Sequence, residues 1–134
     1  MEQDQIEKMV LACIDTAKAM LDEYQMVIPF GLRAFSDTED MKMNCPAEKN
    51  PDAGWQEQIE TVVSELKNHL QTEAVSATAL VTELQSEGER GIGLQIETAA
   101  SSVLFVYPCK KENEEWLIDE PVKTDQLLAS VFEN

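Results

Sequence analysis

The chain is poor in basic side chains, in glycine and proline, and in long apolar runs. It has 10 lysines and arginines against 26 aspartates and glutamates, so its formal net charge at pH 7 is −16. A surface of this sign repels phosphate groups, which argues against binding to nucleic acid or to anionic membranes. No apolar run approaches the roughly 20 residues that a membrane-spanning helix needs. The five glycines and five prolines are too few for a fibrous repeat.

Cysteine and histidine, the usual ligands of transition metals, are also scarce. Cys13, Cys45 and Cys109 are widely spaced and form no CxxC pair, and His69 is the single histidine. These spacings exclude a zinc knuckle and a thioredoxin-type redox site. The sequence also lacks a phosphate-binding glycine loop, a GxSxG elbow and a D-x-D-x-D-G calcium loop. We therefore predict no cofactor and no bound metal, with Cys13 and Cys45 as buried side chains.

The beginning of the chain indicates a compartment. The segment 1–5 is acidic and polar and has neither the basic start nor the apolar core of a signal peptide. An odd number of unpatterned cysteines suits a reducing environment. These features favour the cytoplasm.

Hydrophobic patterning predicts one domain over 1–134 with two long amphipathic helices. The length lies within the usual range of a single domain, and 43% of the residues are hydrophobic. Apolar residues recur at helical spacing over 3–25 and again over 52–72. The second helix should begin at Asn50-Pro51, a cap followed by a proline in the first turn.

Between and after the helices the apolar residues alternate, which is typical of strands. Pro29 lacks a donor and should make 27–35 an edge strand or a bulged strand. Thr124 should cap a short C-terminal helix. These elements predict an α+β fold, order α-β-β-α-β-β-β-(β)-α, with an antiparallel sheet of about five strands and the helices on one face. The other predicted strands are 41–45, 75–84, 92–98, 103–107 and 116–118.

Two kinds of side chain are candidates for a protein interface. Phe30 follows the first helix, and Trp55 and Trp116 are the only tryptophans; an exposed aromatic residue would be a natural anchor. The alternative is that these rings lie in the core. The densest group of carboxylates is the second candidate, as a docking patch for a basic partner or as a solvated turn. Its members in the candidate interface are Glu112, Glu114 and Glu115.

Four short segments together resemble a group of small bacterial α+β proteins that carry a Pro-Phe-Gly motif after the first helix. The segments are Pro29-Phe30-Gly31, the alanine- and valine-rich run 75–81, the alternating run 93–97 and the aromatic run 105–108. The resemblance implies a bacterial α+β protein and brings no catalytic residue with it. The order of elements is also similar to that of roadblock-type domains.

Three functions remain open at this point. The first is a non-catalytic acidic module that binds a basic protein, in the manner of immunity proteins or secretion chaperones, with association accelerated by charge. The second is a small enzyme or ligand-binding protein with a pocket between sheet and helices. The third is a homodimeric structural module that pairs through an edge strand or the first helix. For the second function the candidate polar groups are His69, Glu97, Tyr107 and Cys109.

Overall fold

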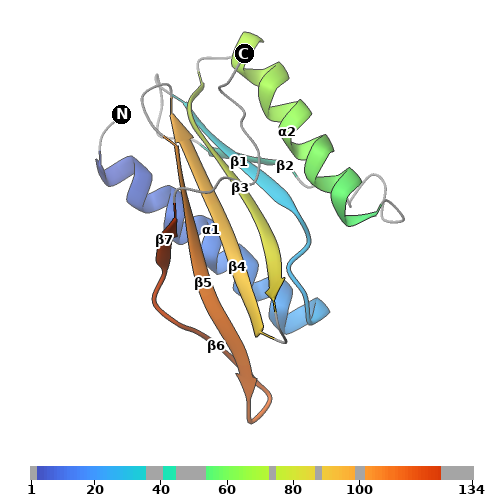
Figure 1. The fold of residues 1–134 in the computed structure, drawn as a ribbon. Coiled ribbons are helices and arrows are strands. Elements are labelled where there is room, and N and C mark those ends of the chain that lie inside the picture. The colour runs from blue at the N-terminus through green and yellow to red at the C-terminus, as the bar shows by residue number, and fades with distance from the viewer. Residues whose placement is uncertain are drawn as a thin grey trace.

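The computed structural model describes residues 3–35, 41–44, 54–72, 75–86, 89–98 and 102–124. Within these ranges, two helices and seven strands form an α+β fold around one antiparallel sheet (Figure 1). The strand order is β2-β1-β3-β4-β5-β6, and β7 also pairs with β5. In chain order the elements are α1 (Gln3–Tyr24), β1 (Phe30–Phe35), β2 (Met41–Asn44), α2 (Trp55–Thr72), β3 (Val75–Ser86), β4 (Glu89–Thr98), β5 (Ser102–Glu112), β6 (Glu115–Ile118) and β7 (Val122–Thr124).

The two helices cover opposite faces of the sheet, so the prediction that both pack on one face is wrong. A Cβ atom added at Gly31 of β1 would lie 2.6 Å from Val62 Cγ1 of α2. Leu80 is paired with Gly31 across β1 and β3, and it packs with Val62 in a small apolar cluster. We call this side the α2 face. In Figure 1 it is turned toward the viewer, and α1 lies behind the sheet.

The other side, the α1 face, carries the main core. Because side chains alternate along a strand, the residues next to Gly31 and Leu80 point away from α2. They pack against the buried stripe of α1 and form one continuous apolar cluster. The strand residues of this cluster include Leu32, Ala34, Ala77, Ala79, Val81, Ile92, Leu94 and Ile96.

Both helices lie close to their predicted positions. Helix α1 ends one residue before the predicted end, where Gln25 adopts a left-handed conformation with φ of 62° and its N–H donates to Leu21 O. Helix α2 begins at Trp55. The predicted cap at Asn50-Pro51 lies outside the described residues. No helix in the described ranges is both long enough and apolar enough to cross a membrane.

Of the two alternatives predicted for the first strand from Pro29, an edge strand or a bulged strand, the edge position is wrong. Strand β1 lies between β2 and β3, and it begins one residue after Pro29. The missing N–H of Pro29 therefore falls outside the ladder, where it removes no strand hydrogen bond. The expected irregularity occurs at the other end of β1, where the register with β3 shifts between Ala34 and Phe35.

The far edge of the sheet is one strand interrupted in the middle. Strands β6 and β7 both pair with the edge of β5 that faces away from β4. Ile118 of β6 lies opposite Cys109, and Val122 of β7 lies opposite Val106. Between them, the N–H of Asp119 donates to Pro108 O at 2.8 Å. The sequence pattern predicted the strand at 116–118 but not the strand at 122–124.

The predicted number of strands, about five, is too low, because the described residues alone form seven. Thr124 was predicted to cap a helix, but it is the last residue of β7. The remainder of the predicted C-terminal helix, 125–134, lies outside the described residues.

Candidate functional site

The predicted interface residues separate into buried rings and exposed carboxylates. Phe30 is fully buried and Trp116 is 4% exposed, so both belong to the core and neither ring presents a surface. Trp55 begins α2, and its side chain lies outside the described part of the structure. Glu112, Glu114 and Glu115 are all exposed. Glu114 lies in the turn between β5 and β6, and Glu112 and Glu115 flank it.

The β5–β6 hairpin holds these carboxylates at the end of a ribbon that projects beyond the rest of the sheet (Figure 1). Glu112 and Glu115 face each other in the register. The two turn residues, Asn113 and Glu114, have φ values of 51° and 65°. Two successive left-handed residues are typical of the tight turn that matches strand twist. The Lys110 ammonium pairs with Glu112 at 3.0 Å, and both side chains are more than half exposed.

An ion pair between a buried carboxylate and a partly exposed arginine anchors the base of this hairpin. Arg90 Nη2 donates to Glu83 Oε1 at 2.6 Å, and Arg90 Nε donates to Glu83 Oε2 at 2.9 Å. The Glu83 side chain is 3% exposed. Its Oε1 also accepts the Val27 N–H at 3.0 Å, and its Oε2 accepts from Gln85 at 2.6 Å. The carboxylate is therefore fully supplied with donors, as a buried charge requires.

These contacts set the ionisation of the pair. Burial acts to raise the pKa of Glu83, but the hydrogen bonds from Arg90, Gln85 and the Val27 backbone together lower it below its ordinary value. The hydrogen bond to Glu83 raises the pKa of Arg90. Both groups are charged at neutral pH.

The same arginine connects the end of α1 to the hairpin. Arg90 Nη2 donates to Gln25 O at 2.7 Å, and the guanidinium lies 4.6 Å from the centroid of the Trp116 ring. Lys111 Nζ donates to Gln25 Oε1 at 2.7 Å. Strands β3, β4, β5 and β6 and the residue after α1 thus meet around one guanidinium. This arrangement holds the base of the hairpin in a defined orientation.

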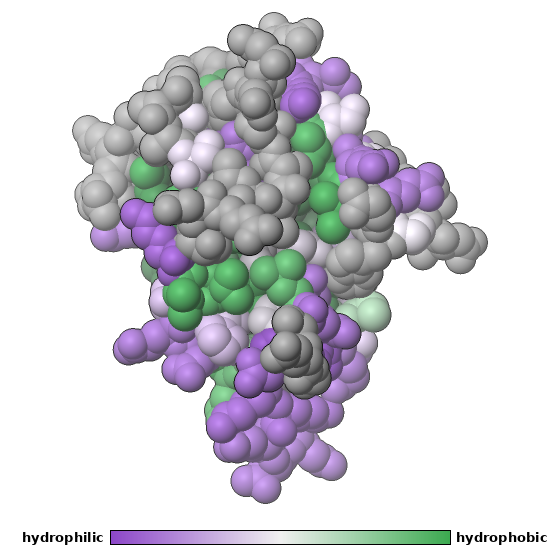
Figure 2. Space-filling view, viewed as in Figure 1, coloured by the Kyte–Doolittle hydropathy of each residue, from purple (hydrophilic) through white to green (hydrophobic). Residues whose placement is uncertain are grey.

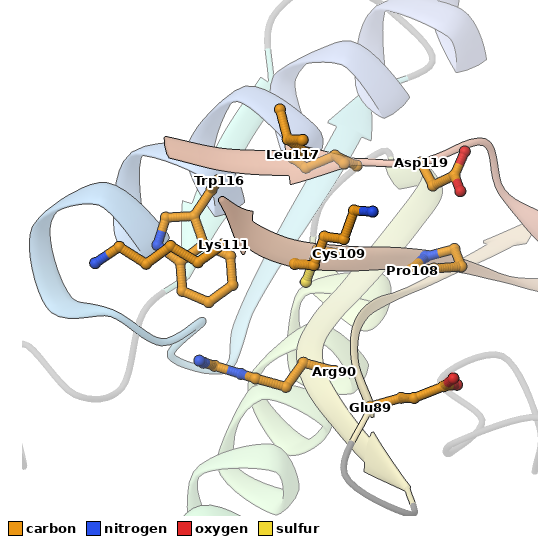
Figure 3. A pocket seen from close by; sticks show the side chains of 10 residues that line it. Glu89, Arg90, Pro108, Cys109, Lys111, Trp116, Leu117 and Asp119 are labelled. Atoms are coloured by element: carbon orange, nitrogen blue, oxygen red, sulfur yellow. The ribbon is translucent and has the colours of Figure 1, made fainter. Parts of the chain in front are cut away.

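A cavity of about 720 Å³ lies where β4 begins, β5 ends and β6 pairs with it (Figure 3). Its volume is within the range of small-molecule sites. The register shows that its lining residues alternate between the two faces of the sheet, so their side chains do not converge on one point. Arg90, Cys109, Lys111, Trp116 and Ile118 belong to the α1 face, and Glu89, Pro108, Lys110, Leu117 and Asp119 complete the lining.

The polar groups considered for a catalytic pocket are also divided between the faces. Tyr107 and Cys109 lie on the α1 face, opposite Ile92 and Arg90 of β4. Glu97 lies on the α2 face, between Thr78 and Ser102. The side chain of His69 falls outside the described part of α2. The sheet therefore separates Glu97 from the Tyr107 and Cys109 side chains.

A polar row on the α2 face, buried at Arg33, Thr78 and Glu97 and exposed at Ser102, was not foreseen from the sequence. Arg33, Thr78, Glu97 and Ser102 follow one another across β1, β3, β4 and β5. Glu97 Oε1 accepts from Gln95 Nε2 at 2.7 Å, and Glu97 Oε2 accepts from Ser102 Oγ at 3.3 Å. Gln95 and Glu97 are each 1% exposed, so this polar side of β4 is buried. Hydrogen bonds from Gln95 and Ser102 therefore hold the buried Glu97 carboxyl group in place.

The described thiols are poorly suited to nucleophilic chemistry. Burial raises the pKa of Cys13 to about 12. Burial also raises the pKa of Cys109, and this effect outweighs the lowering by Arg90. Because the thiolate is the reactive form, both cysteines are predominantly protonated at neutral pH. Cys13 is buried as predicted, and Cys45 lies outside the described residues.

Within the described ranges, no group of three histidine, cysteine, aspartate or glutamate side chains is placed to hold a metal ion. Among the features described above, the β5–β6 hairpin is the one that presents a group of charged side chains to solvent from an anchored base. Comparison of the chain with family models, with curated proteins and with solved structures finds no match. The resemblance of its Pro-Phe-Gly segment to small bacterial proteins stays an expectation from sequence.

Proposed function

We propose that this protein is a non-catalytic binding module whose partner is a basic protein. The observation that carries the proposal is the projecting β5–β6 hairpin, with the exposed carboxylates of Glu112, Glu114 and Glu115 at its tip. Its base is held by the Glu83–Arg90 pair. A rigid, exposed group of like charges accelerates encounter with a surface of opposite charge and makes association sensitive to salt.

The net charge of the whole chain supports the same partner class. With 16 more acidic than basic side chains, the long-range field favours basic proteins and disfavours a second copy of the same chain. The enzyme hypothesis has less support, because Glu97 lies on the opposite face of the sheet from Tyr107 and Cys109. A bacterial cytoplasmic location remains part of the proposal.

The test is an affinity capture from native cell extract with three forms of the tagged protein. The first is the wild type, and the second is a hairpin variant with Glu112→Gln, Glu114→Gln and Glu115→Gln. The third is a matched control that removes three exposed carboxylates of α1, with substitutions Glu7→Gln, Asp15→Asn and Asp22→Asn. Bound proteins are eluted with low salt and then with high salt and quantified by mass spectrometry.

We expect a stoichiometric basic protein that elutes at high salt from the wild type and from the α1 control, and that is strongly reduced with the hairpin variant. Equal loss with both variants would show that only total charge matters and would remove the role of the hairpin. A partner that stays bound at high salt, or that is not basic, would contradict the proposal.

A further inference from the structure

An exposed apolar strip lies on the α2 face beside the hairpin. It consists of Val106 and Pro108 of β5, Leu117 of β6 and Val122 of β7. Val122 and Leu117 are 59% and 39% exposed, Pro108 is exposed, and Val106 is half-buried opposite Val122. The register places β6 and β7 one after the other along the same edge of β5, with Leu117 opposite Lys110 and Val122 opposite Val106. Pro108 lies between these two β5 positions and on the same face. Large apolar side chains grouped in this way mark interaction surfaces more often than single exposed ones do.

The strip is continuous with the charged hairpin. In Figure 2, hydrophobic atoms form a band over β7 and β5, and hydrophilic atoms cover the hairpin below it. Helix α2 packs on β1 and β3, at the other side of this face. From Val106 to Glu112 the chain rises six residues, about 20 Å at the usual rise per residue of a strand. One short segment of a partner protein is long enough to touch both ends.

Charges border the strip as well as the tip of the hairpin. Glu89 and Asp119 line the cavity next to Pro108 and Leu117, and among the described residues neither carboxylate has a cationic partner. The Lys110 ammonium on the same face is neutralised locally by Glu112. An incoming segment therefore meets an apolar floor with unneutralised carboxylates at its border.

The apolar strip and its acidic border together indicate which kind of partner binds there. A second copy of the chain would bring its own acidic hairpin and border against these carboxylates, and like charges in close apposition oppose association. A purely polar basic segment would leave Leu117 and Val122 in water. A segment with apolar side chains on one side and lysine or arginine on the other can cover the apolar strip and pair with the carboxylates at its border.

We propose that the apolar strip is the docking surface for a basic amphipathic segment of the partner protein, with its apolar side chains on Leu117 and Val122 and its cations on Glu89, Asp119 and the hairpin. This proposal rests on the proposed function and adds where and how the partner binds. If the segment is helical, about 14 residues span the 20 Å between strip and tip at 1.5 Å per residue.

The experiment uses two synthetic peptides of equal length and charge. The first is an amphipathic helix built from lysine and leucine, and the second replaces every leucine with serine. Both are titrated by calorimetry against the full-length wild type and against a strip variant with Leu117→Gln and Val122→Thr. The matched control, Leu11→Gln with Met43→Gln, changes two apolar residues of similar exposure (64% and 47%) on α1 and β2. The hairpin variant is the fourth protein, and urea unfolding checks that each variant is folded.

We expect the lysine–leucine peptide to bind saturably, with one peptide per protein molecule, to the wild type and to the control. The strip variant should bind it at least about tenfold more weakly, which corresponds to about 1.4 kcal/mol of lost apolar contact. The lysine–serine peptide should bind weakly and equally to the wild type and to the strip variant. The hairpin variant should bind both peptides more weakly.

Unchanged binding of the lysine–leucine peptide by the strip variant would overturn the docking proposal, and the proposed function would stand if the hairpin variant still lost affinity. Failure of both peptides to bind the wild type would contradict the proposed function itself. Light scattering that shows a wild-type dimer, dissociated by the strip substitutions, would assign the strip to a second copy and would also overturn the docking proposal.

Discussion

Arg90 Nη2 lies 2.6 Å from Glu83 Oε1, and this contact joins the start of β4 to the end of β3 beneath the β5–β6 hairpin. The carboxylate is almost fully buried, whereas the arginine side chain is 30% exposed. The pair also fixes the residues that follow α1, through Val27 N–H and Gln25 O. One ion pair thus links the main helix of the core to the proposed binding element.

Replacing Glu83 with glutamine should destabilise the fold by about 2 kcal/mol, because it removes the charge that compensates Arg90 and weakens its hydrogen bonds. The value is below that of a fully buried pair, since Arg90 is partly exposed. Urea unfolding measures the change. Glu89→Gln, which alters an exposed carboxylate without an ion pair among the described residues, should change the stability by less than about 0.5 kcal/mol. Similar losses for the two variants would contradict the structural role of the pair.

The stability of the Glu83–Arg90 contact should depend on pH in a defined direction. The pKa of Glu83 is lowered in the folded protein, so its contribution is complete above the unfolded carboxyl pKa of about 4.3 and is lost as pH falls through the folded value. The stability difference between wild type and Glu83→Gln should therefore shrink from pH 6 to pH 3. Taking the difference cancels the exposed carboxylates common to both proteins. A constant difference over this range would show that Glu83 does not titrate as described.

Gly31→Ala should destabilise the packing of α2 on the sheet by about 1–3 kcal/mol, since overpacking of a filled site costs this much. The added Cβ would lie 2.6 Å from Val62 Cγ1 and 3.1 Å from Leu66 Cδ1. Val62→Ala in the same chain should recover part of the loss, which a double-mutant cycle measures. Gly54→Ala is the control, because no atom of the described residues lies within 4 Å of its added Cβ. Strict additivity of Gly31→Ala and Val62→Ala would contradict the contact.

Trp116→Phe should cost far less stability than Trp116→Ala. The indole Nε1 is buried and has no hydrogen-bond partner among the described residues, so phenylalanine removes no hydrogen bond. Alanine leaves a large cavity beneath Arg90, and such truncations cost about 3–5 kcal/mol. Chemical unfolding of both variants provides the comparison. If phenylalanine were as damaging as alanine, the indole nitrogen would have a role that this structure does not show.

The thiols of Cys13 and Cys109 should be inert in the folded protein. In a Cys45→Ser background, a chromogenic thiol reagent at pH 8 should react slowly with the native protein and rapidly with both thiols in denaturant. The reasons are burial and the raised pKa values, about 12 for Cys13. Fast stoichiometric labelling of a native thiol would show that one of these sites opens.

Local patterns in the sequence were sufficient for most of the secondary structure. Helical spacing predicted α1 to within one residue of its end, and alternation predicted β1, β2 and β3 near their places. The carboxylates of the hairpin were also visible as a group. These features depend on neighbours along the chain, which a sequence displays directly.

The position of β1 in the sheet was decided by tertiary structure. Pro29 favours an edge, but the strand begins after it and is flanked by β2 and β3. A missing N–H constrains only the residue that carries it, so it does not exclude pairing of the next six residues. The helices lie on opposite faces for a similar reason: periodicity shows that a helix has an apolar side but not which side of the sheet receives it.

The candidate site shows the same division. Charge and turn residues in the sequence identified Glu112, Glu114 and Glu115, whereas the burial of Phe30 and Trp116 and the Glu83–Arg90 anchor depended on contacts between distant segments. Glu97 and Cys109 looked equally eligible for one pocket, because alternation assigns sides only within a strand. The register of β4 against β5 relates the sides of different strands, and it places these two residues on opposite faces. The sequence by itself therefore determined the acidity, the two helices and the exposed tip, and only the tertiary structure decided which side chains share a surface.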